Sequence, residues 1–574
     1  MRWFFPLLLL FAVTAQAAGP GKAAIASAHP LATDAGFQML EQGGNAYDAA
    51  VAVAAALSVV EPYSAGMGGG GFWLLHREKD DLQTMLDARE TAPAAATEDM
   101  YQAMLNPRFS LSVLSAEDMY QDQDGQVVRD RAVNGALAAG IPGQAAAFAY
   151  LAEHYGELPL KTTLAPAIKL ARQGFEVEDH YRALAGYRKD VLNRYPTAAS
   201  VFLDDGEIPA NGTLIRQPDL ARVLEALAEQ GRDGFYQGPV AEKLVRGVRE
   251  AGGIWTKQDL NNYRVKERAP VVGHYRGARI VTAPPPSAGG LVMLEALNIL
   301  NEFNGGEISE DLLPHLTVEA WRRAYQDRGR YMGDPDFVSI PVDNLLSKSY
   351  AEQRAASIKL DKATPSSELG EPVATGEGFH TTHFSVLDGA GNRVAATLSI
   401  NLPFGSGFMP AGTGVILNNE MDDFSAKPGS PNAYGLVGSK ANAVAPGKRP
   451  LSSMTPTFVE FDDRVAILGT PGGSRIITMV MLGVLEAAND APVDDWVSRV
   501  RFHHQFLPDQ VQAEPAFLDT EAAKSLRLRG HDVVSVDREY GNMQAILWRH
   551  EDNSVTAASD PRGIGAARVG ADAD

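Results

Sequence analysis

The apolar and polar positions near the N-terminus predict two helices followed by a strand. The helical pattern of residues 29–62 is interrupted once, by Gly43 and Gly44. Glycine ends helices readily and Asn45 is a favourable cap, so we expect one helix before the glycines and a second after Asn45. Residues 49–60, AAVAVAAALSVV, are too few to cross a bilayer and predict a buried helix. The glycine run of SAGMGGGGFWLL, residues 64–75, leads into an apolar strand.

The pattern changes to strands at residue 381. Two β-like runs, THFSVLD and RVAATLSIN, are separated by GAGN, which predicts a hairpin with its turn centred near Ala390. Equal spacing on either side of this centre places Thr381 opposite Ser399. A second hairpin is expected over residues 457–470, and PGGS then opens a helix over residues 475–490. The polar residues 355–378 predict an exposed, flexible segment just before Thr381.

Composition and charge narrow the class of protein. Of the 574 residues, 45% are hydrophobic and 21% charged, which is ordinary for a globular protein. The formal net charge of -20 argues against nucleic acid or an anionic membrane as the main partner. The chain has 0 cysteines, which excludes disulfides, cysteine nucleophiles and thiolate metal sites. Residues 1–17 combine Arg2, an apolar run and an A-x-A sequence, the pattern of a secretory signal peptide. We therefore expect an exported protein, periplasmic or secreted, with no membrane anchor after signal removal.

Several motifs leave a structural and a chemical interpretation open. The sequence lacks the G-x-S-x-G elbow, the P-loop and the H-E-x-x-H zinc motif. In TPGGS, the N–H groups of Gly472 and Gly473 could hold a developing oxyanion, although tight packing explains two glycines equally well. The carboxylates of LNNEMDDF, the hydroxyls of RPLSSMTP and the side chain of Arg89 could equally belong to solvated turns and surface ion pairs. Thr381 could act as a nucleophile if a cut made it N-terminal, because its α-amine could then serve as the base.

Nine sequence blocks together resemble the bacterial γ-glutamyltranspeptidases. In chain order they are VEPYSAGMGGGGF, DARETAP, PPPSAGG, DRGRYMGDPDF, TTHFSV, NNEMDDFSAKPG, KRPLSSMTPT, PGGSRIIT and ASDPR, and the resemblance covers nearly everything after the signal peptide. It implies an α+β fold of the N-terminal-nucleophile type, an αββα sandwich with two stacked β-sheets between helix layers. It also implies a precursor that cuts itself between His380 and Thr381. The large subunit, residues 18–380, and the small subunit, residues 381–574, would then form a heterodimer that is one structural unit.

The same resemblance implies a role for each candidate site residue. Thr381 is the expected nucleophile, with Ser399 beside it and the N–H groups of Gly472 and Gly473 as the oxyanion hole. Tyr434 is expected in a lid loop over the substrate. The residues expected to bind the charged ends of a γ-glutamyl group are Arg89, Ser452 and Ser453 for the α-carboxylate and Asn401, Glu420 and Asp423 for the α-ammonium. No metal or organic cofactor is implied.

The implied reaction transfers the γ-glutamyl group of glutathione, or of a related γ-glutamyl compound, to water or to an acceptor amino acid or peptide. Two positions depart from the family pattern. Ser399 replaces a common threonine but keeps the hydroxyl, and Glu420 replaces a glutamine of many bacterial members, which adds negative charge. A cephalosporin (glutaryl) acylase of the same superfamily is the nearest alternative, but its substrate lacks the α-amino group that Glu420 and Asp423 would bind. A non-enzymatic periplasmic solute-binding protein, which would need no cut, is the alternative from another class.

Overall fold

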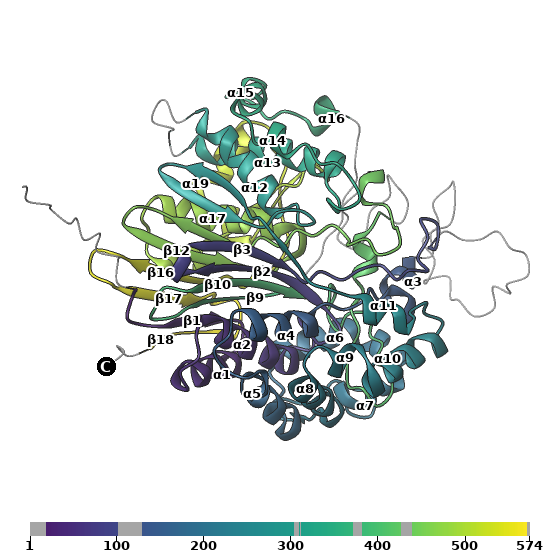
Figure 1. The fold of residues 1–574 in the computed structure, drawn as a ribbon. Helices are drawn as coiled ribbons and strands as arrows, with labels where there is room; N and C mark the ends of the chain where they lie inside the picture. The colour runs from purple at the N-terminus through teal and green to yellow at the C-terminus, as the bar shows by residue number, and fades with distance from the viewer. Residues whose placement is uncertain are drawn as a thin grey trace, which may run out of the picture.

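Two β-sheets lie face to face between two layers of helices (Figure 1). The computed structural model describes residues 19–101, 129–303, 309, 311–370, 381–425 and 439–570. Within these residues the larger sheet has 7 strands, in the order β18 (Ala566–Val569), β1 (Ala24–Ser27), β9 (Thr382–Leu387), β10 (Arg393–Ser399), β2 (Gly70–Arg77), β3 (Leu82–Asp87) and β6 (Lys266–Arg268). The smaller has 6, in the order β17 (Val555–Ser559), β16 (Gln544–Arg549), β12 (Arg464–Gly469), β11 (Thr457–Glu460), β8 (Ala278–Thr282) and β7 (Val271–Tyr275). The expected α+β, αββα architecture is confirmed.

The sheets pack through alternate side chains, because successive residues of a strand point to opposite faces. In β2, Phe72 and Leu74 pack between the two sheets, whereas Trp73 and Leu75 pack against helices. The outer face of the smaller sheet is covered in the same way, with Leu468 of β12 packed on the second helix layer. Both faces of the central strands are therefore buried, including the polar residues of β9 and β10.

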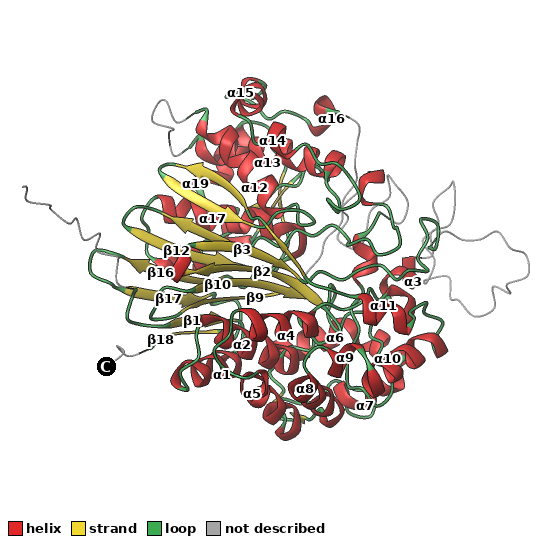
Figure 2. Cartoon of the chain, in the orientation of Figure 1, coloured by secondary structure: helices red, strands yellow, loops and turns green. Residues whose placement is uncertain are grey.

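The first helix layer covers the larger sheet (Figure 2). Its first two helices, α1 (Pro30–Glu41) and α2 (Ala46–Val60), are the two that the sequence predicts. The side chain of Asn45 accepts hydrogen bonds from the N–H groups of Tyr47 and Asp48 and caps α2, every residue of which is buried. The other helices of this layer are α4 (Gln144–His154), α5 (Leu160–Gln173), α6 (Asp179–Arg194), α7 (Pro196–Phe202), α8 (Pro218–Gln230), α9 (Asp233–Tyr236), α10 (Gly238–Glu250) and α11 (Lys257–Asn262).

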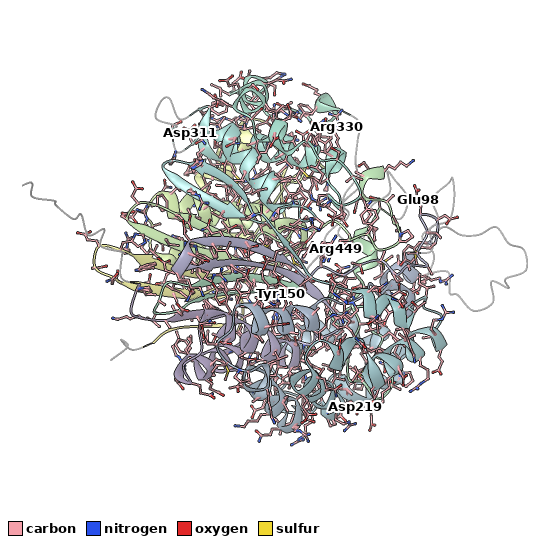
Figure 3. The ribbon with its side chains drawn as sticks, in the orientation of Figure 1. Glu98, Tyr150, Asp219, Asp311, Arg330 and Arg449 are labelled. Carbon is pink, nitrogen blue, oxygen red and sulfur yellow. The ribbon has the colours of Figure 1, made fainter. Side chains whose placement is uncertain are left out.

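The second helix layer covers the smaller sheet and is built around three helices, α12 (Gly289–Asn301), α13 (Leu313–Tyr331) and α17 (Ile476–Ala488). Shorter elements complete the fold, namely α3 (Arg129–Val133), α14 (Val342–Leu345), α15 (Lys348–Ala356), α16 (Ser366–Leu369), α18 (Val493–Ser498), α19 (Glu521–Leu528), the pair β4 (Phe175–Glu176) and β5 (Leu214–Ile215), and the small sheet of β13 (Phe502–His503), β14 (Val511–Ala513) and β15 (Val533–Ser535). Exposed charged side chains such as Glu98, Asp311 and Arg330 lie at the periphery (Figure 3). No helix of the described residues is long and apolar enough to span a membrane.

The predicted hairpins are confirmed together with the register of the first. β9 and β10 are antiparallel neighbours and pair Thr382 with Leu398, so the next position along the ladder sets Thr381 against Ser399. β11 and β12 form the second hairpin, and α17 begins shortly after the glycines of PGGS. The central hairpin thus brings two hydroxyl side chains to one end of the larger sheet.

The expectation of an exposed, flexible segment over residues 355–378 is confirmed for exposure at most positions of the described part, residues 355–370, but not for all of them. This part contains α16, and both Thr364 and Ser366 are buried. The N–H of Thr364 donates to Glu319 Oε1 at 3.0 Å, and that of Ser366 donates to Asp509 Oδ2 at 2.7 Å. The polar residues are held by carboxylates from distant segments, which local composition does not reveal. Residues 371–380 lie outside the described residues.

Candidate active site

Thr381 and Ser399 lie at the end of the central hairpin and are buried, with exposed fractions of 7% and 3%. The glycine run that leads into β2 passes directly beside them. A Cβ atom on Gly69 would lie 2.1 Å from the carbonyl oxygen of Ser399, and one on Gly70 would lie 2.2 Å from that of Ala88. The run therefore consists of glycines because the backbones of the hairpin and of the loop before Arg89 both approach it too closely for a side chain.

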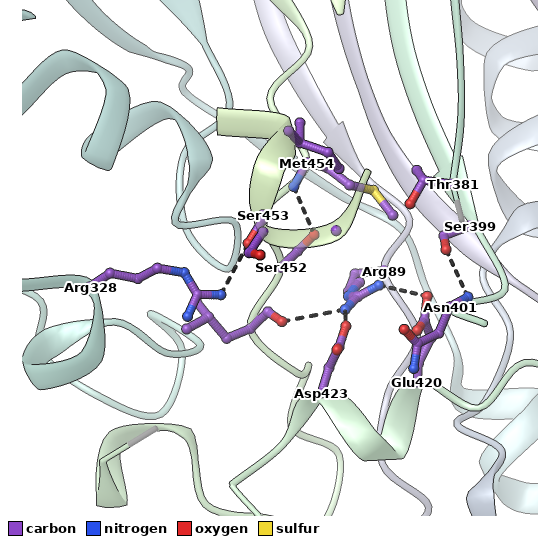
Figure 4. Close-up of a pocket in the computed structure, with 14 residues that line it drawn as sticks. Arg89, Arg328, Thr381, Ser399, Asn401, Glu420, Asp423, Ser452, Ser453 and Met454 are labelled. Carbon is purple, nitrogen blue, oxygen red and sulfur yellow. Dashed lines mark hydrogen bonds and ion pairs between the residues drawn. The ribbon is translucent and has the colours of Figure 1, made fainter. Parts of the chain in front are cut away.

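A pocket opens beside the two hydroxyls (Figure 4). It is formed where the hairpin end, the loop after β3, the turn after residue 418, the segment 451–454 and the start of α17 converge. Most of its wall is polar, with both positive and negative side chains. The residues that line it are Arg89, Arg328, Thr381, Ser399, Asn401, Glu420, Asp423, Leu451, Ser452, Ser453, Met454, Gly473, Ser474 and Ile476.

Arg89 lies at the centre of a buried charge cluster in this pocket. Its guanidinium, 1% exposed, donates to Glu420 Oε1 at 2.7 Å and also to Asp423 (Figure 4). Burial works against its charge, but Glu420, Asp423 and Glu90 raise the pKa of Arg89 above its ordinary value. Burial in turn raises the pKa of Glu420 and of Asp423, and Arg89 opposes that rise. One cation is therefore shared by two carboxylates.

Two asparagines hold these carboxylates in place. Glu420 and Asp423 belong to a short 3₁₀ helix, Glu420–Asp423, that follows Asn418 and Asn419. Asn418 Oδ1 accepts from the N–H of Gly140 and from that of Glu420, at 2.9 and 3.0 Å. The carbonyl of Asn419 accepts from Asn401 Nδ2 at 2.9 Å, which joins the turn to the residue that follows the hairpin. The acidic cluster is thus a buried, tethered turn and not a solvated one.

Ser452 and Ser453 present hydroxyl groups to the opposite part of the pocket. Ser452 Oγ accepts from the N–H of Met454 at 3.1 Å, and Ser453 Oγ accepts from Arg328 Nη2 at 3.1 Å. Neither hydroxyl donates to another residue that the structure describes. Each serine therefore keeps its own proton for an acceptor in the pocket, which suits an anion.

Gly472 and Gly473 join β12 to α17 in a conformation that favours glycine. Their φ angles are 139° and 56°. A Cβ on Gly472 would lie 2.6 Å from Met479 Cε. Neither N–H donates to an acceptor among the described residues. Gly473 lines the pocket with Ser474, and Gly472 precedes it in the chain but does not itself line the pocket. The N–H of Gly473 thus belongs to a residue that lines the same pocket as Thr381 and is not used by another described residue.

One group of side chains elsewhere has the composition of a metal site, namely His315, Glu319 and His531. Its nitrogen atoms are already engaged. Arg322 Nη2 lies 3.4 Å from His531 Nδ1, His531 Nε2 lies 2.8 Å from His315 Nδ1, and His315 Nε2 lies 2.7 Å from the carbonyl of Lys359. If Arg322 donates to His531, His531 to His315, and His315 to the carbonyl of Lys359, both rings are neutral imidazoles with every nitrogen satisfied. The geometry is that of a polar cluster in the core.

Comparison with known proteins places the chain in a family. The sequence matches the Gamma-glutamyltranspeptidase family over residues 32–570. The chain belongs to this family. It is 41% identical over 547 residues to the glutathione hydrolase proenzyme of Escherichia coli (strain K12), which covers 94% of this chain and 90% of that protein. Among solved structures, a cephalosporin acylase from Bacillus halodurans superposes with a TM-score of 0.79 at 29% identity and covers 99% of both chains. A Helicobacter pylori γ-glutamyltranspeptidase superposes with a TM-score of 0.54 at 38% identity and covers 60% of this chain and 93% of that one.

For this γ-glutamyltranspeptidase-family chain, the pocket brings together most of the residues that the sequence singled out. Those that line it are Thr381, Ser399, Arg89, Asn401, Glu420, Asp423, Ser452, Ser453 and Gly473. Gly472 is next to it, and His380 and Tyr434 lie outside the described residues. Their chemical roles stay predictions. Sequence reasoning missed Arg328 as a pocket residue, although it lies in the block DRGRYMGDPDF, because nothing in that block separates it from the other arginines of α13.

Proposed function

We propose that this protein is an exported γ-glutamyltranspeptidase, periplasmic or secreted, that removes the γ-glutamyl group from glutathione and related compounds. Residues 1–17 serve as its signal peptide. The precursor cuts itself between His380 and Thr381, and residues 18–380 and 381–574 stay together as a heterodimer. Membership of the γ-glutamyltranspeptidase family and the 41% identity to the Escherichia coli glutathione hydrolase proenzyme support the proposal.

The observation that carries the proposal is the separation of charge beside Thr381. A γ-glutamyl group ends in an α-carboxylate and an α-ammonium, so it needs anion donors and cation acceptors close together. In the pocket, Ser453 lies against Arg328, whereas Glu420 and Asp423 lie against Arg89. Buried charges need partners of opposite sign, so such a pocket favours a zwitterionic end over an apolar one.

The cut that exposes the nucleophile uses the same hydroxyl as the later reaction. Thr381 Oγ attacks the carbonyl carbon of His380, and the C–N bond breaks as the acyl group moves from nitrogen to oxygen. Water then hydrolyses the resulting ester. This releases a carboxylate on His380 and leaves a free α-amine on Thr381.

In turnover, Thr381 Oγ attacks the γ-amide carbon of the substrate while the α-amine of Thr381 takes the hydroxyl proton. The N–H groups of Gly472 and Gly473 stabilise the oxyanion. Collapse breaks the amide C–N bond, and the proton passes from the α-amine to the leaving amine. Water or an acceptor amine then attacks the γ-glutamyl ester, which regenerates the hydroxyl of Thr381. Ser399 lies next to Thr381 in the hairpin and orients that hydroxyl.

A glutaryl acylase is the second candidate, and the similarity to the Bacillus halodurans cephalosporin acylase favours it. A glutaryl group keeps the carboxylate of a γ-glutamyl group but has no ammonium. It would leave Glu420 and Asp423 with only Arg89 to pair with. We therefore rank γ-glutamyl transfer first.

Two measurements on the purified protein test the proposal. A denaturing gel is expected to give two chains, and N-terminal sequencing of the smaller one is expected to begin at Thr381. Turnover of a γ-glutamyl anilide and a glutaryl anilide is then measured with and without a dipeptide acceptor. A single uncut chain without turnover would support a solute-binding protein, and a preference for the glutaryl compound would support the acylase.

A further inference from the structure

Arg328 is a buried cation without a carboxylate partner among the described residues. It lies in the last turn of α13, is 4% exposed and lines the pocket. Its Nη2 donates a hydrogen bond to Ser453 Oγ at 3.1 Å, and its Nε has no hydrogen-bond partner among the described residues. Two other buried arginines of the same helix are paired, since Arg322 contacts Asp509 and Arg323 contacts Glu319. An unpaired buried guanidinium is costly unless a ligand supplies the missing anion.

Arg89, the other arginine of the pocket, already has carboxylates close to its guanidinium. Arg89 already contacts both Glu420 and Asp423, and Glu90 lies 3.6 Å from its Nη1. The pKa values of the two guanidinium groups move in opposite directions. The pKa of Arg89 is raised by its carboxylate neighbours despite burial, whereas burial lowers the pKa of Arg328 even though Tyr325 and Asp423 oppose the decrease. Arg328, which has no carboxylate within ion-pair distance among the described residues, therefore adds positive potential for a substrate anion to that of Arg89.

Arg328 also sets the direction of a hydroxyl group. Because Ser453 Oγ accepts from Arg328, the Ser453 proton points away from the guanidinium. Figure 4 shows Arg328 on one side of Ser453 and Ser452, and Arg89 on the other. An anion in front of the two serines would receive both hydroxyl protons and would lie one side chain away from the charge of Arg328.

We propose that Arg328 is a specificity-determining residue that supplies the net positive charge for the substrate carboxylate and orients Ser453 as a donor to it. The inference rests on the proposed function for the identity of the substrate. It requires only that the acyl group ends in a carboxylate, so it applies to γ-glutamyl and glutaryl groups alike. An acyl group with an ammonium and no carboxylate, such as a 4-aminobutyryl group, gains nothing from Arg328.

The carboxylate is remote from the bond that breaks, so Arg328 is expected to stabilise the ground state and the transition state equally. Its loss should then raise KM and leave kcat nearly unchanged. A hydrogen bond to a charged group is worth enough for an effect of at least about tenfold in KM. A general distortion of the pocket would instead lower kcat and affect all substrates.

The test compares wild type with Arg328→Gln and Arg328→Lys on three anilides, γ-glutamyl, glutaryl and 4-aminobutyryl. We expect Arg328→Gln to raise KM at least about tenfold for the first two and by less than about twofold for the third. Arg328→Lys keeps the charge and should recover part of the loss. Arg330→Gln, on the same helix but exposed and outside the pocket, is the matched control and should behave as wild type.

A second measurement does not depend on turnover. Glutarate binding, measured by calorimetry, should weaken in Arg328→Gln and in Ser453→Ala. The double variant should lose less binding free energy than the sum of the two single losses, because both changes disrupt the same pair of donors. Equal losses for all three anilides, or unchanged glutarate binding, would overturn the proposal. If wild type cuts the glutaryl but not the γ-glutamyl anilide, the proposed function fails while the inference on Arg328 is still decided by glutarate.

Discussion

Replacing Asp423 with asparagine removes one of the two carboxylates that face Arg89 and, in the proposed complex, the substrate ammonium. The side chain of Asp423 is 13% exposed and that of Glu420 is 1% exposed, so neither charge is well solvated. Asparagine keeps the shape and can still accept a hydrogen bond, so the change removes mainly charge. Without Asp423, Glu420 alone must serve both Arg89 and the incoming ammonium.

The expected loss follows from this burial. Breaking a buried ion pair by removing one partner costs about 3–5 kcal/mol. Glu420 remains and Asp423 has some contact with solvent, so we expect a value near the lower end of this range. About 2.7 kcal/mol corresponds to a hundredfold, since each 1.36 kcal/mol is roughly tenfold in a rate constant. Asp423→Asn should therefore lower kcat/KM for a γ-glutamyl anilide at least about a hundredfold.

The assay measures γ-glutamyl and glutaryl anilides side by side on wild type and variant. The glutaryl compound lacks the ammonium and should lose far less. Asp422→Asn is the matched control, because Asp422 is buried in the same 3₁₀ helix but does not line the pocket. Equal fractional losses for both compounds in Asp423→Asn would refute the reasoning and give Asp423 a purely structural role.

Three further outcomes are expected. Thr381→Ala should leave one uncut chain on a denaturing gel where wild type gives two, and a cut variant would remove Thr381 as the nucleophile. Ser399→Ala should slow both maturation and turnover while Ser399→Thr is tolerated, because the hairpin register sets this hydroxyl beside Thr381; unchanged kinetics in Ser399→Ala would argue against the register argument. His383 is buried between the sheets, and burial lowers its pKa to about 3. Its imidazole therefore stays neutral in the folded protein, whereas in the unfolded chain it takes up a proton below about pH 6.5. Its contribution to stability is therefore complete above that pH and falls by about 1.4 kcal/mol per unit as pH drops toward 3, and urea unfolding at pH 7, 6 and 5 should show a shallower loss in His383→Gln than in wild type.

Features set by neighbours in the chain could be predicted from the sequence. Gly43, Gly44 and Asn45 determine where α1 ends and α2 begins, because end signals and caps act within one turn. The turn centred near Ala390 determines the register of the hairpin, because antiparallel partners are symmetric about the turn.

Features set by distant contacts could not be predicted in this way. The local context of Glu420 reads as a solvated acidic turn, and only its contact with Arg89 explains its burial. Ser366 lies in a polar stretch but is held by Asp509. Arg328 resembles its paired neighbours in α13 until the tertiary structure brings it against Ser453. The resemblance to a family supplied roles for most pocket residues, but it did not reveal how the charges of the pocket balance.

The strand order has a consequence for the two products of the proposed cut. In the larger sheet, β1 of the N-terminal part lies between β18 and β9 of the C-terminal part, and β10 pairs with β2; in the smaller sheet, β11 pairs with β8. The two chains would be interwoven through continuous ladders in both sheets, so neither could leave without exposing unpaired strand edges. Halves made separately should therefore have to fold together to assemble, and two enzymes that are already cut should not form hybrids when they are mixed. The covalent link between the two parts would thus be needed for folding, before the cut, and not afterwards.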